Sequence, residues 1–190
     1  HIGLINFKLR HICVFSIYKL MKSKENIVFL GMMGSGKTSI GSIVSKRLNL
    51  NFFDTDQAIE NNEEMKIAKI FQSKGERFFR DIEKKITLEI LRNKKGVIAL
   101  GGGAFMNKVV KREVLENHLS FWLNWDNDTL INRIKNSKKR PLAINSNRDK
   151  LIDIIKKRSI IYSKALYKID CENLTKQEIA KKIIKIYETN

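Results

Sequence analysis

Residues 31–38 read G-M-M-G-S-G-K-T, which matches the phosphate-binding signature G-x-x-x-x-G-K-T. The apolar run 27–30 precedes this stretch and a helical pattern over 39–48 follows it. The motif therefore stands in the strand, loop and helix context that it requires. Glycines let the loop backbone come close to an anion, and N–H groups of the loop and of the next helix then surround phosphate oxygens. The flanking elements disfavour the alternative, a glycine-rich turn that ends in Lys-Thr by chance.

The loop also predicts roles for single side chains. Lys37 is expected to reach the β- and γ-phosphates of a nucleotide, and the Thr38 hydroxyl is expected to ligate Mg²⁺. The residues that we expect to hold the nucleotide phosphates are Gly34, Ser35, Gly36, Lys37, Thr38 and Ser39.

The remaining chain alternates apolar runs with helical patterns. We expect strands at 27–30, 51–54, 97–100, 119–123 and 165–169. We expect helices at 39–48, 57–74 (in one or two pieces), 76–93, 107–117, 126–136, 149–163 and from 175 onward. Gly75 should break the pattern between the second and third helices, Asp126 should cap one helix, and Thr175 with Glu178 should form a capping box. This alternation predicts an α/β fold with three layers, in which helices cover both faces of a five-stranded parallel sheet.

Composition limits the class of protein. The chain has 190 residues, which suits a single domain, and its 43% hydrophobic content is enough for a core. The net charge is +17, which suits nucleic-acid binding or the steering of anionic substrates. The alternative is a lysine-rich composition spread over solvated faces. The basic residues are scattered without an RNA-binding aromatic signature, so we favour that alternative and expect no nucleic-acid partner.

The first twenty residues differ from the rest, since they contain no acidic residue. We expect residues 1–20 to be an extension outside the core, with Met21 as the true start, and a short membrane-surface anchor is the minor alternative. No apolar run has the length of a membrane span. Cys13 and Cys171 lie far apart without metal-ligand spacing. We therefore expect a cytoplasmic protein without a membrane partner, and a monomer.

Polar groups follow the predicted strands at the edge where parallel sheets bind ligands. Asp54 and Asp56 come directly after the second strand, and they can serve a metal and an acceptor hydroxyl separately. Alternatively, Asp56 only caps the next helix, and spacing leaves both interpretations open. The run 101–103 is Gly-Gly-Gly, which suggests a backbone that offers N–H donors to a ligand, with a flexible turn as the alternative.

Arginines supply the remaining candidates. Arg80 and Glu83 lie one helical turn apart. They are either an exposed ion pair that adds little stability, or Arg80 binds a substrate carboxylate while Glu83 holds the arginine in place. Phe71 and Phe79 are core residues or lining of that site. The polar segment 137–149 contains Arg140 and is either a solvated loop or a lid that brings this arginine to the phosphates.

These elements in this order resemble the shikimate kinase family, in the nucleoside-monophosphate-kinase branch of phosphate-loop folds. The matching stretches are G-M-M-G-S-G-K-T (31–38), D-T-D (54–56), G-E-R-F-F-R-D-I-E (75–83), G-G-G (101–103), R-P-L (140–142) and R-S-I-I-Y (158–162). The resemblance covers the chain from about Ile27 to its end. It implies a single domain over 21–190, a lid at about 137–149 and the strand order 2-3-1-4-5.

The resemblance also implies an activity, the transfer of the ATP γ-phosphoryl group to the 3-hydroxyl of shikimate in aromatic amino-acid biosynthesis. In that activity Asp56 holds and deprotonates the hydroxyl, while Arg80 and Arg158 bind the carboxylate. Gly102 and Gly103 offer backbone donors to the ring hydroxyls, and Arg133 stacks on adenine. Lys37 and Arg140 stabilise the transferring group, and Asp54 lies with Thr38 at Mg²⁺.

Two rival interpretations remain. One is a related small-molecule kinase that acts on gluconate or a nucleotide. The other is a basic nucleotide-regulated binding protein without turnover, against which Lys37, Asp56 and Arg140 together argue.

Overall fold

The computed structural model describes residues 26–135 and 147–189. Five parallel strands form one sheet in the order β2-β3-β1-β4-β5. The strands are β1 (Ile27–Leu30), β2 (Phe52–Asp54), β3 (Val97–Ala99), β4 (Leu119–Asn124) and β5 (Tyr167–Asp170). The predicted parallel sheet and its strand order are confirmed.

Strand β1 lies at the centre of the sheet, where Val28 is in register with Ile98 of β3 and Ser120 of β4. Its side chains alternate between two core clusters. Ile27 and Phe29 belong to one cluster, and Val28 and Leu30 to the other. Burial on both faces explains why the sequence of this strand is uniformly apolar.

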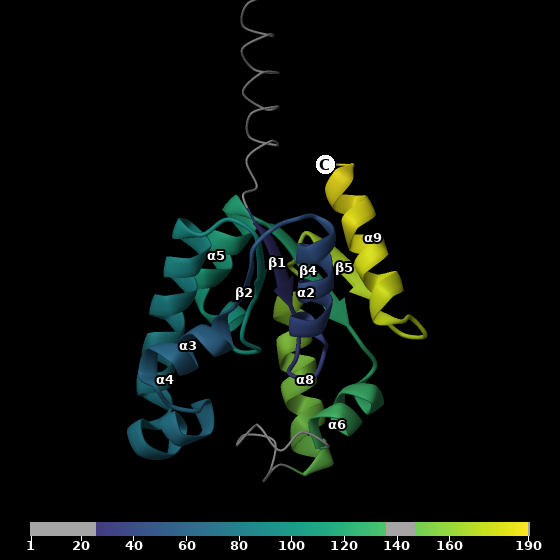
Figure 1. The fold of residues 1–190 in the computed structure, drawn as a ribbon. Coiled ribbons are helices and arrows are strands. Elements are labelled where there is room, and N and C mark those ends of the chain that lie inside the picture. The colour runs from purple at the N-terminus through teal and green to yellow at the C-terminus, as the bar shows by residue number, and fades with distance from the viewer. Residues whose placement is uncertain (1–25, 136–146, 190) are drawn as a thin grey trace, which may run out of the picture.

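Helices cover both faces of the sheet (Figure 1). The helices α2 (Lys37–Arg47) and α9 (Lys176–Glu188) complete the cluster around Phe29, whereas α4 (Ile67–Asn93), α5 (Lys108–Asn117), α6 (Asn127–Lys135) and α8 (Arg148–Tyr162) complete the cluster around Leu30. The short elements α3 (Thr55–Glu63) and η1 (Ala104–Met106) follow β2 and β3. The predicted three layers are thus present.

The helix caps mostly follow the sequence-based predictions. Thr175 and Glu178 form the capping box of α9, and Asp126 Oδ1 accepts the N–H of Thr129 at 2.7 Å at the start of α6. One boundary differs. The predicted helix 149–163 begins one residue earlier, at Arg148, because the Asn147 side chain accepts the N–H of Lys150 at 2.9 Å and starts α8 there.

The helical region before β3 is divided at two places. Glu64 has a left-handed backbone (φ 51°) and ends α3, so the predicted helix 57–74 is in two pieces. Gly75 separates two helical stretches of α4, as predicted, and a kink joins them. Its own conformation, φ 81° and ψ 170°, is non-helical and bends α4 at this point.

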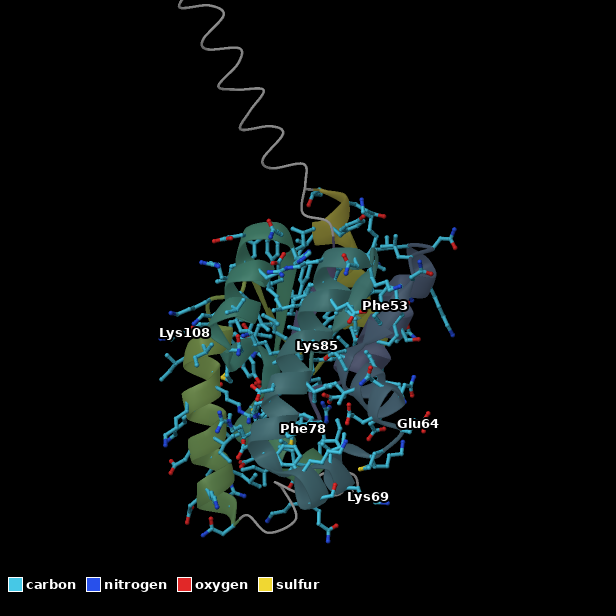
Figure 2. All side chains as sticks on the ribbon, turned by 90° about the vertical axis from the view of Figure 1, so that its left-hand side faces the viewer. Phe53, Glu64, Lys69, Phe78, Lys85 and Lys108 are labelled. Carbon is cyan, nitrogen blue, oxygen red and sulfur yellow. The ribbon has the colours of Figure 1, made fainter. Side chains whose placement is uncertain are left out.

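Lys69, Lys85 and Lys108 are well separated in Figure 2, and Glu64 lies on the same side. No helix in the described ranges combines the length and the apolar character that crossing a membrane requires. The predicted extension 1–20, Arg140 and most of the predicted lid (137–146) lie outside the described residues.

Candidate active site

The phosphate-binding loop connects β1 directly to α2. Gly34 and Gly36 have φ values of 80° and 89°, a left-handed backbone that favours glycine, and Gly36 is the N-cap of α2. The Nζ of Lys37 donates to the carbonyl oxygens of Gly31 and Met32, at 2.9 Å each, so the ammonium group lies within the loop. Thr38 and Ser39 are exposed in the first turn of α2. The loop therefore has the strand–turn–helix form that its sequence predicted.

Thr38 and Asp54 bring two oxygen groups together beside this loop. The Thr38 hydroxyl donates to Asp54 Oδ2 at 2.6 Å, while Asp54 Oδ1 accepts the N–H groups of Asp56 and Gln57. Asp54 is thus the N-cap of α3, so the interpretation in which Asp56 caps that helix is wrong. Mg²⁺ binds oxygen ligands through few protein groups and keeps several waters, so this hydroxyl–carboxylate pair fits such an ion. Within the described ranges no group of three or more His, Cys, Asp or Glu side chains gathers around a common point.

The first glycine of the run 101–103 makes room for two carboxylates. A Cβ atom at Gly101 would overlap Asp56 Oδ1 and would lie 3.1 Å from Glu83 Oε1. The Gly101 N–H donates to the buried Thr55 hydroxyl at 2.8 Å, which fixes the run against the start of α3. A side chain at position 101 would therefore push Asp56 and Glu83 away from this point.

The other two glycines contact the arginines. A Cβ at Gly103 would overlap the Nη1 of Arg80. The carbonyl of Gly102 accepts Arg158 Nη1 at 3.2 Å and also accepts the hydroxyl of Tyr162. The glycine run thus accommodates the site's own side chains, a use that the sequence-based prediction of backbone donors did not include.

Arg80 and Glu83 form a partly buried pair rather than an exposed one. Arg80 Nη1 donates to Glu83 Oε2 at 2.8 Å, and only 5% of the Glu83 side chain is exposed. The other edge of the guanidinium contacts Glu76 at 3.1 Å. Phe79 is a core residue whose ring packs against that of Phe71 at an angle of 36°, and the Arg80 guanidinium lies over both rings. The interpretation of an exposed ion pair is therefore wrong, and Arg80 is fixed on several sides.

Burial controls the protonation of the groups around this pair. Burial raises the pKa of Glu83, and the Asp56 carboxylate adds to this effect, whereas Arg80 and Arg158 oppose it. Burial likewise raises the pKa of Tyr162 to about 12, against the effect of Arg158. Tyr162 therefore keeps its proton at neutral pH and remains a hydrogen-bond donor to Gly102.

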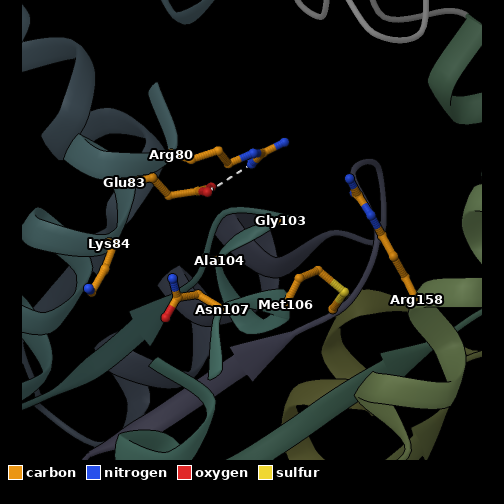
Figure 3. A pocket seen from close by; sticks show the side chains of 8 residues that line it. All are labelled: Arg80, Glu83, Lys84, Gly103, Ala104, Met106, Asn107 and Arg158. Atoms are coloured by element: carbon orange, nitrogen blue, oxygen red, sulfur yellow. Dashed lines mark hydrogen bonds and ion pairs between the residues drawn. The ribbon is translucent and has the colours of Figure 1, made fainter. Parts of the chain in front are cut away.

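A pocket of about 290 Å³ opens beside these groups. Figure 3 shows the guanidinium groups of Arg80 and Arg158 projecting from α4 and α8 towards the space above Gly103. The lining residues are Arg80, Glu83, Lys84, Gly103, Ala104, Met106, Asn107 and Arg158. Three cationic side chains and one buried carboxylate line the pocket, so it suits a compact anion.

Arg133 lies on the nucleotide side of the site. Its Cζ atom is 3.8 Å from the ring centroid of Trp125, and Trp125 Nε1 donates to the carbonyl of Ser35 in the phosphate loop at 2.9 Å. The sequence-based predictions missed Trp125 and gave Tyr162 no role. Trp125 comes just after a predicted strand, and Tyr162 lies within the stretch 158–162, so these positions could have indicated a place at the site.

Comparison with known protein families shows to which family the chain belongs. Residues 33–188 match the family described as shikimate kinase. The chain belongs to the shikimate kinase family. A shikimate kinase of Thermodesulfovibrio yellowstonii is 38% identical over 165 residues, which are 86% of this chain and 95% of that protein. The shikimate kinase of Bacillus subtilis is also 38% identical, over 85% of this chain and 88% of that protein.

Solved shikimate kinases share the fold. The enzyme from Acinetobacter baumannii in complex with shikimate has a TM-score of 0.82 and 29% identity, and the match covers 90% of this chain and 97% of the other. The enzyme from Aquifex aeolicus has a TM-score of 0.77 and 31% identity over 86% of this chain and 96% of the other. A deoxyadenosine kinase from M. mycoides, at 18% identity and a TM-score of 0.58, shares the fold alone.

Proposed function

We infer that this chain transfers the γ-phosphoryl group of ATP to the 3-hydroxyl of shikimate and releases shikimate 3-phosphate and ADP. One observation carries the inference. The anion pocket with Arg80, Arg158 and the buried Glu83 lies at the same edge of the sheet as the phosphate-binding loop. Family membership and the shikimate complex of the Acinetobacter baumannii relative support the same substrate.

On the acceptor side, we propose that Arg80 and Arg158 bind the substrate carboxylate, with Glu83 orienting Arg80. The N–H groups of Gly102 and Gly103 donate to ring hydroxyls of the substrate. The Gly101 N–H does not take part, because it already donates to the Thr55 hydroxyl. Asp56 orients the 3-hydroxyl and accepts its proton as the hydroxyl oxygen attacks the γ-phosphorus. The Asp56 carboxylate lies next to Gly101 and does not cap α3, so it is available to the acceptor hydroxyl.

On the donor side, the loop N–H groups and the first turn of α2 hold the phosphates, with Gly34, Ser35, Gly36 and Ser39 contributing backbone donors. Lys37 balances charge on the transferring group, which requires its ammonium to exchange the carbonyls of Gly31 and Met32 for phosphate oxygens. Arg133 lies against the base. Arg140, outside the described residues, stays a predicted partner of the phosphates.

We further propose that Thr38 and Asp54 hold Mg²⁺ with the nucleotide. Bound there, the ion supplies positive charge to the β- and γ-phosphate oxygens. The supporting observation is the 2.6 Å contact between the two side-chain oxygens beside the loop.

Several expectations about the whole protein stay predictions. These are the single domain over 21–190, the lid near 137–149, a monomeric state, the absence of nucleic-acid and membrane partners, and a cytoplasmic location.

An assay of ADP release tests the function. The protein is supplied with ATP and Mg²⁺ and with shikimate, gluconate or AMP as acceptor. We expect turnover with shikimate and little above background with the other two, because only a carboxylate with ring hydroxyls satisfies both the arginines and Asp56. Faster turnover with gluconate or AMP than with shikimate would overturn the proposal.

A further inference from the structure

Trp125 stands between two parts of the proposed nucleotide site. It follows β4 directly, at the carboxyl edge of the sheet. Its Nε1 donates to the Ser35 carbonyl at 2.9 Å, and its ring lies 3.8 Å from the Cζ atom of Arg133. One side chain therefore touches both the loop expected to hold the phosphates and the guanidinium expected to hold the base.

The position of Trp125 is fixed by its surroundings. The indole is partly buried and packs against both core clusters of the sheet. The next residue, Asp126, caps α6 through the N–H of Thr129. The phosphate loop and α6 also touch directly, because a Cβ at Gly34 would lie 3.3 Å from the Cβ of Arg133. Trp125, the loop and Arg133 thus form one packed unit.

The guanidinium of Arg133 can take a second ring. A guanidinium is planar and stacks on aromatic faces, and Arg133 uses one face on the indole while its side chain is exposed.

We propose that Trp125 is a positioning residue for the purine nucleotide, as the inner layer of an indole–guanidinium–purine stack that is tied to the phosphate loop through the Ser35 carbonyl. This inference rests on the proposed function, which needs ATP at this edge of the sheet. It adds the side chain that holds the base platform and the phosphate loop at a fixed separation.

The rival account is that Trp125 only fills space. An apolar side chain of similar size would do that equally well, but it would neither donate to Ser35 nor offer a π-face to Arg133. Two substitutions separate these features. Trp125→Phe keeps a ring and removes the donor, while Trp125→Leu removes both.

Calorimetric titration with ADP and Mg²⁺ gives the first readout. We expect the ADP Kd to rise about threefold in Trp125→Phe, from loss of one hydrogen bond, and about tenfold in Trp125→Leu, which also loses the stack. The KM for shikimate should stay within twofold in both. Equal losses for ADP and shikimate, or an ADP Kd within twofold of the parent in Trp125→Leu, would overturn the proposal.

Fluorescence gives a second readout that does not depend on the leucine variant folding. The chain has two tryptophans, Trp122 and Trp125. ADP should change the emission of the parent and of the matched variant Trp122→Phe, which keeps Trp125. It should leave the emission of Trp125→Phe unchanged. An ADP response that persists in Trp125→Phe and is lost in Trp122→Phe contradicts the stack.

The two proposals fail in different ways. If the parent does not phosphorylate shikimate, the proposed function falls. If the parent phosphorylates shikimate while Trp125→Leu binds ADP as the parent does, only the role of Trp125 falls.

Discussion

Asp56 and Arg80 lie at opposite ends of the glycine run, and their proposed roles predict different kinetic losses. Asp56→Asn keeps the size of the side chain but removes its charge and its capacity to accept a proton. We expect kcat to fall by roughly 10² to 10⁴, the usual contribution of a general base, with a smaller change in shikimate affinity. Steady-state kinetics with shikimate would measure both, and turnover near the parent rate would exclude Asp56 as the base.

Arg80→Ala should act mainly on binding, because it leaves the substrate carboxylate unpaired in a partly buried pocket. The expected loss is about 2 to 5 kcal/mol of shikimate binding, seen as a raised KM, with kcat affected less. Lys85→Ala, an exposed position on the same helix, is the matched control and should leave KM unchanged. Titration of shikimate separates the two results, and parent-like affinity in Arg80→Ala would contradict the carboxylate fork.

Glu83 provides a pH-dependent test. Burial raises its folded-state pKa above the ordinary value of 4.5, even with Arg80 opposing. The contribution of Glu83 to stability is then fully present below pH 4.5 and is lost as pH rises through the raised pKa. Glu83→Gln is neutral throughout, so at pH 7 to 8 it should unfold no more easily than the parent. Its KM for shikimate should nevertheless rise about tenfold, roughly 1.4 kcal/mol, because Arg80 loses its ionised partner.

Denaturant unfolding of the parent and of Glu83→Gln from pH 4 to 8, with shikimate KM measured at pH 7.5, checks this prediction. The parent should gain stability relative to the variant as pH falls. A variant that is much less stable than the parent at pH 8 would show that ionised Glu83 stabilises the fold.

Single residues show where sequence patterns reach their limit. Helical spacing places Glu83 on the buried side of α4, because it lies three residues before Ile86 and seven before Ile90. What the spacing does not predict is the room for its carboxylate, which the glycine run after β3 provides. Likewise, the spacing of Asp54 and Asp56 left the cap undecided, because the answer depends on the residue at which β2 ends.

At the scale of elements, α4 bends at Gly75, between Phe71 and Phe79, the two rings that the Arg80 guanidinium covers. Gly75 has φ 81° and ψ 170°, a region that is essentially restricted to glycine and costs other residues about 1 to 3 kcal/mol. No atom lies within 4 Å of a Cβ placed there. The cost of a substitution would therefore come from the backbone and not from a clash.

Gly75→Ala should reduce the free energy of unfolding by about 1 to 3 kcal/mol and raise the KM for shikimate, because the packed pair of Phe71 and Phe79 under Arg80 spans the bend. Ser73→Ala, an exposed position in the same turn, is the control and should change stability by less than about 0.5 kcal/mol. Urea unfolding and steady-state kinetics provide the two values. Parent-like stability in Gly75→Ala would mean that the helix accepts a straight path.

The elements themselves were largely predictable, because β1, β3 and most of β4 are short apolar runs. The helices α3, α5, α6, α8 and α9 also begin at a side chain that caps them. The errors lie at boundaries. The break after Glu63 has no glycine or proline signal, since Glu64 itself adopts the left-handed conformation. At Gly75, by contrast, the glycine correctly predicted the break between two helical stretches.

For the whole molecule, the predicted division between an extension and a single domain can be tested by truncation. The described core begins at Asn26 and the family match begins at residue 33. Because the family match lies wholly after Met21, a chain that begins at Met21 should fold and keep its shikimate turnover within about twofold. Circular dichroism and the ADP-release assay measure both properties, and a truncated chain that aggregates or loses most activity would refute the division.

The central place of β1 has a consequence for how the chain acquires its activity during synthesis. Residues 31–38 leave the ribosome early, yet β1 pairs with β3 through Val97 and with β4 through Leu119. Contacts between residues so distant in sequence form slowly, and they form only after the later strands exist. A nascent chain that stops before Leu119 thus carries the complete phosphate-loop motif without one of its two neighbouring strands. ATP consequently cannot assist folding by binding early, and the protection it gives against proteolysis should begin only once β4 has been made.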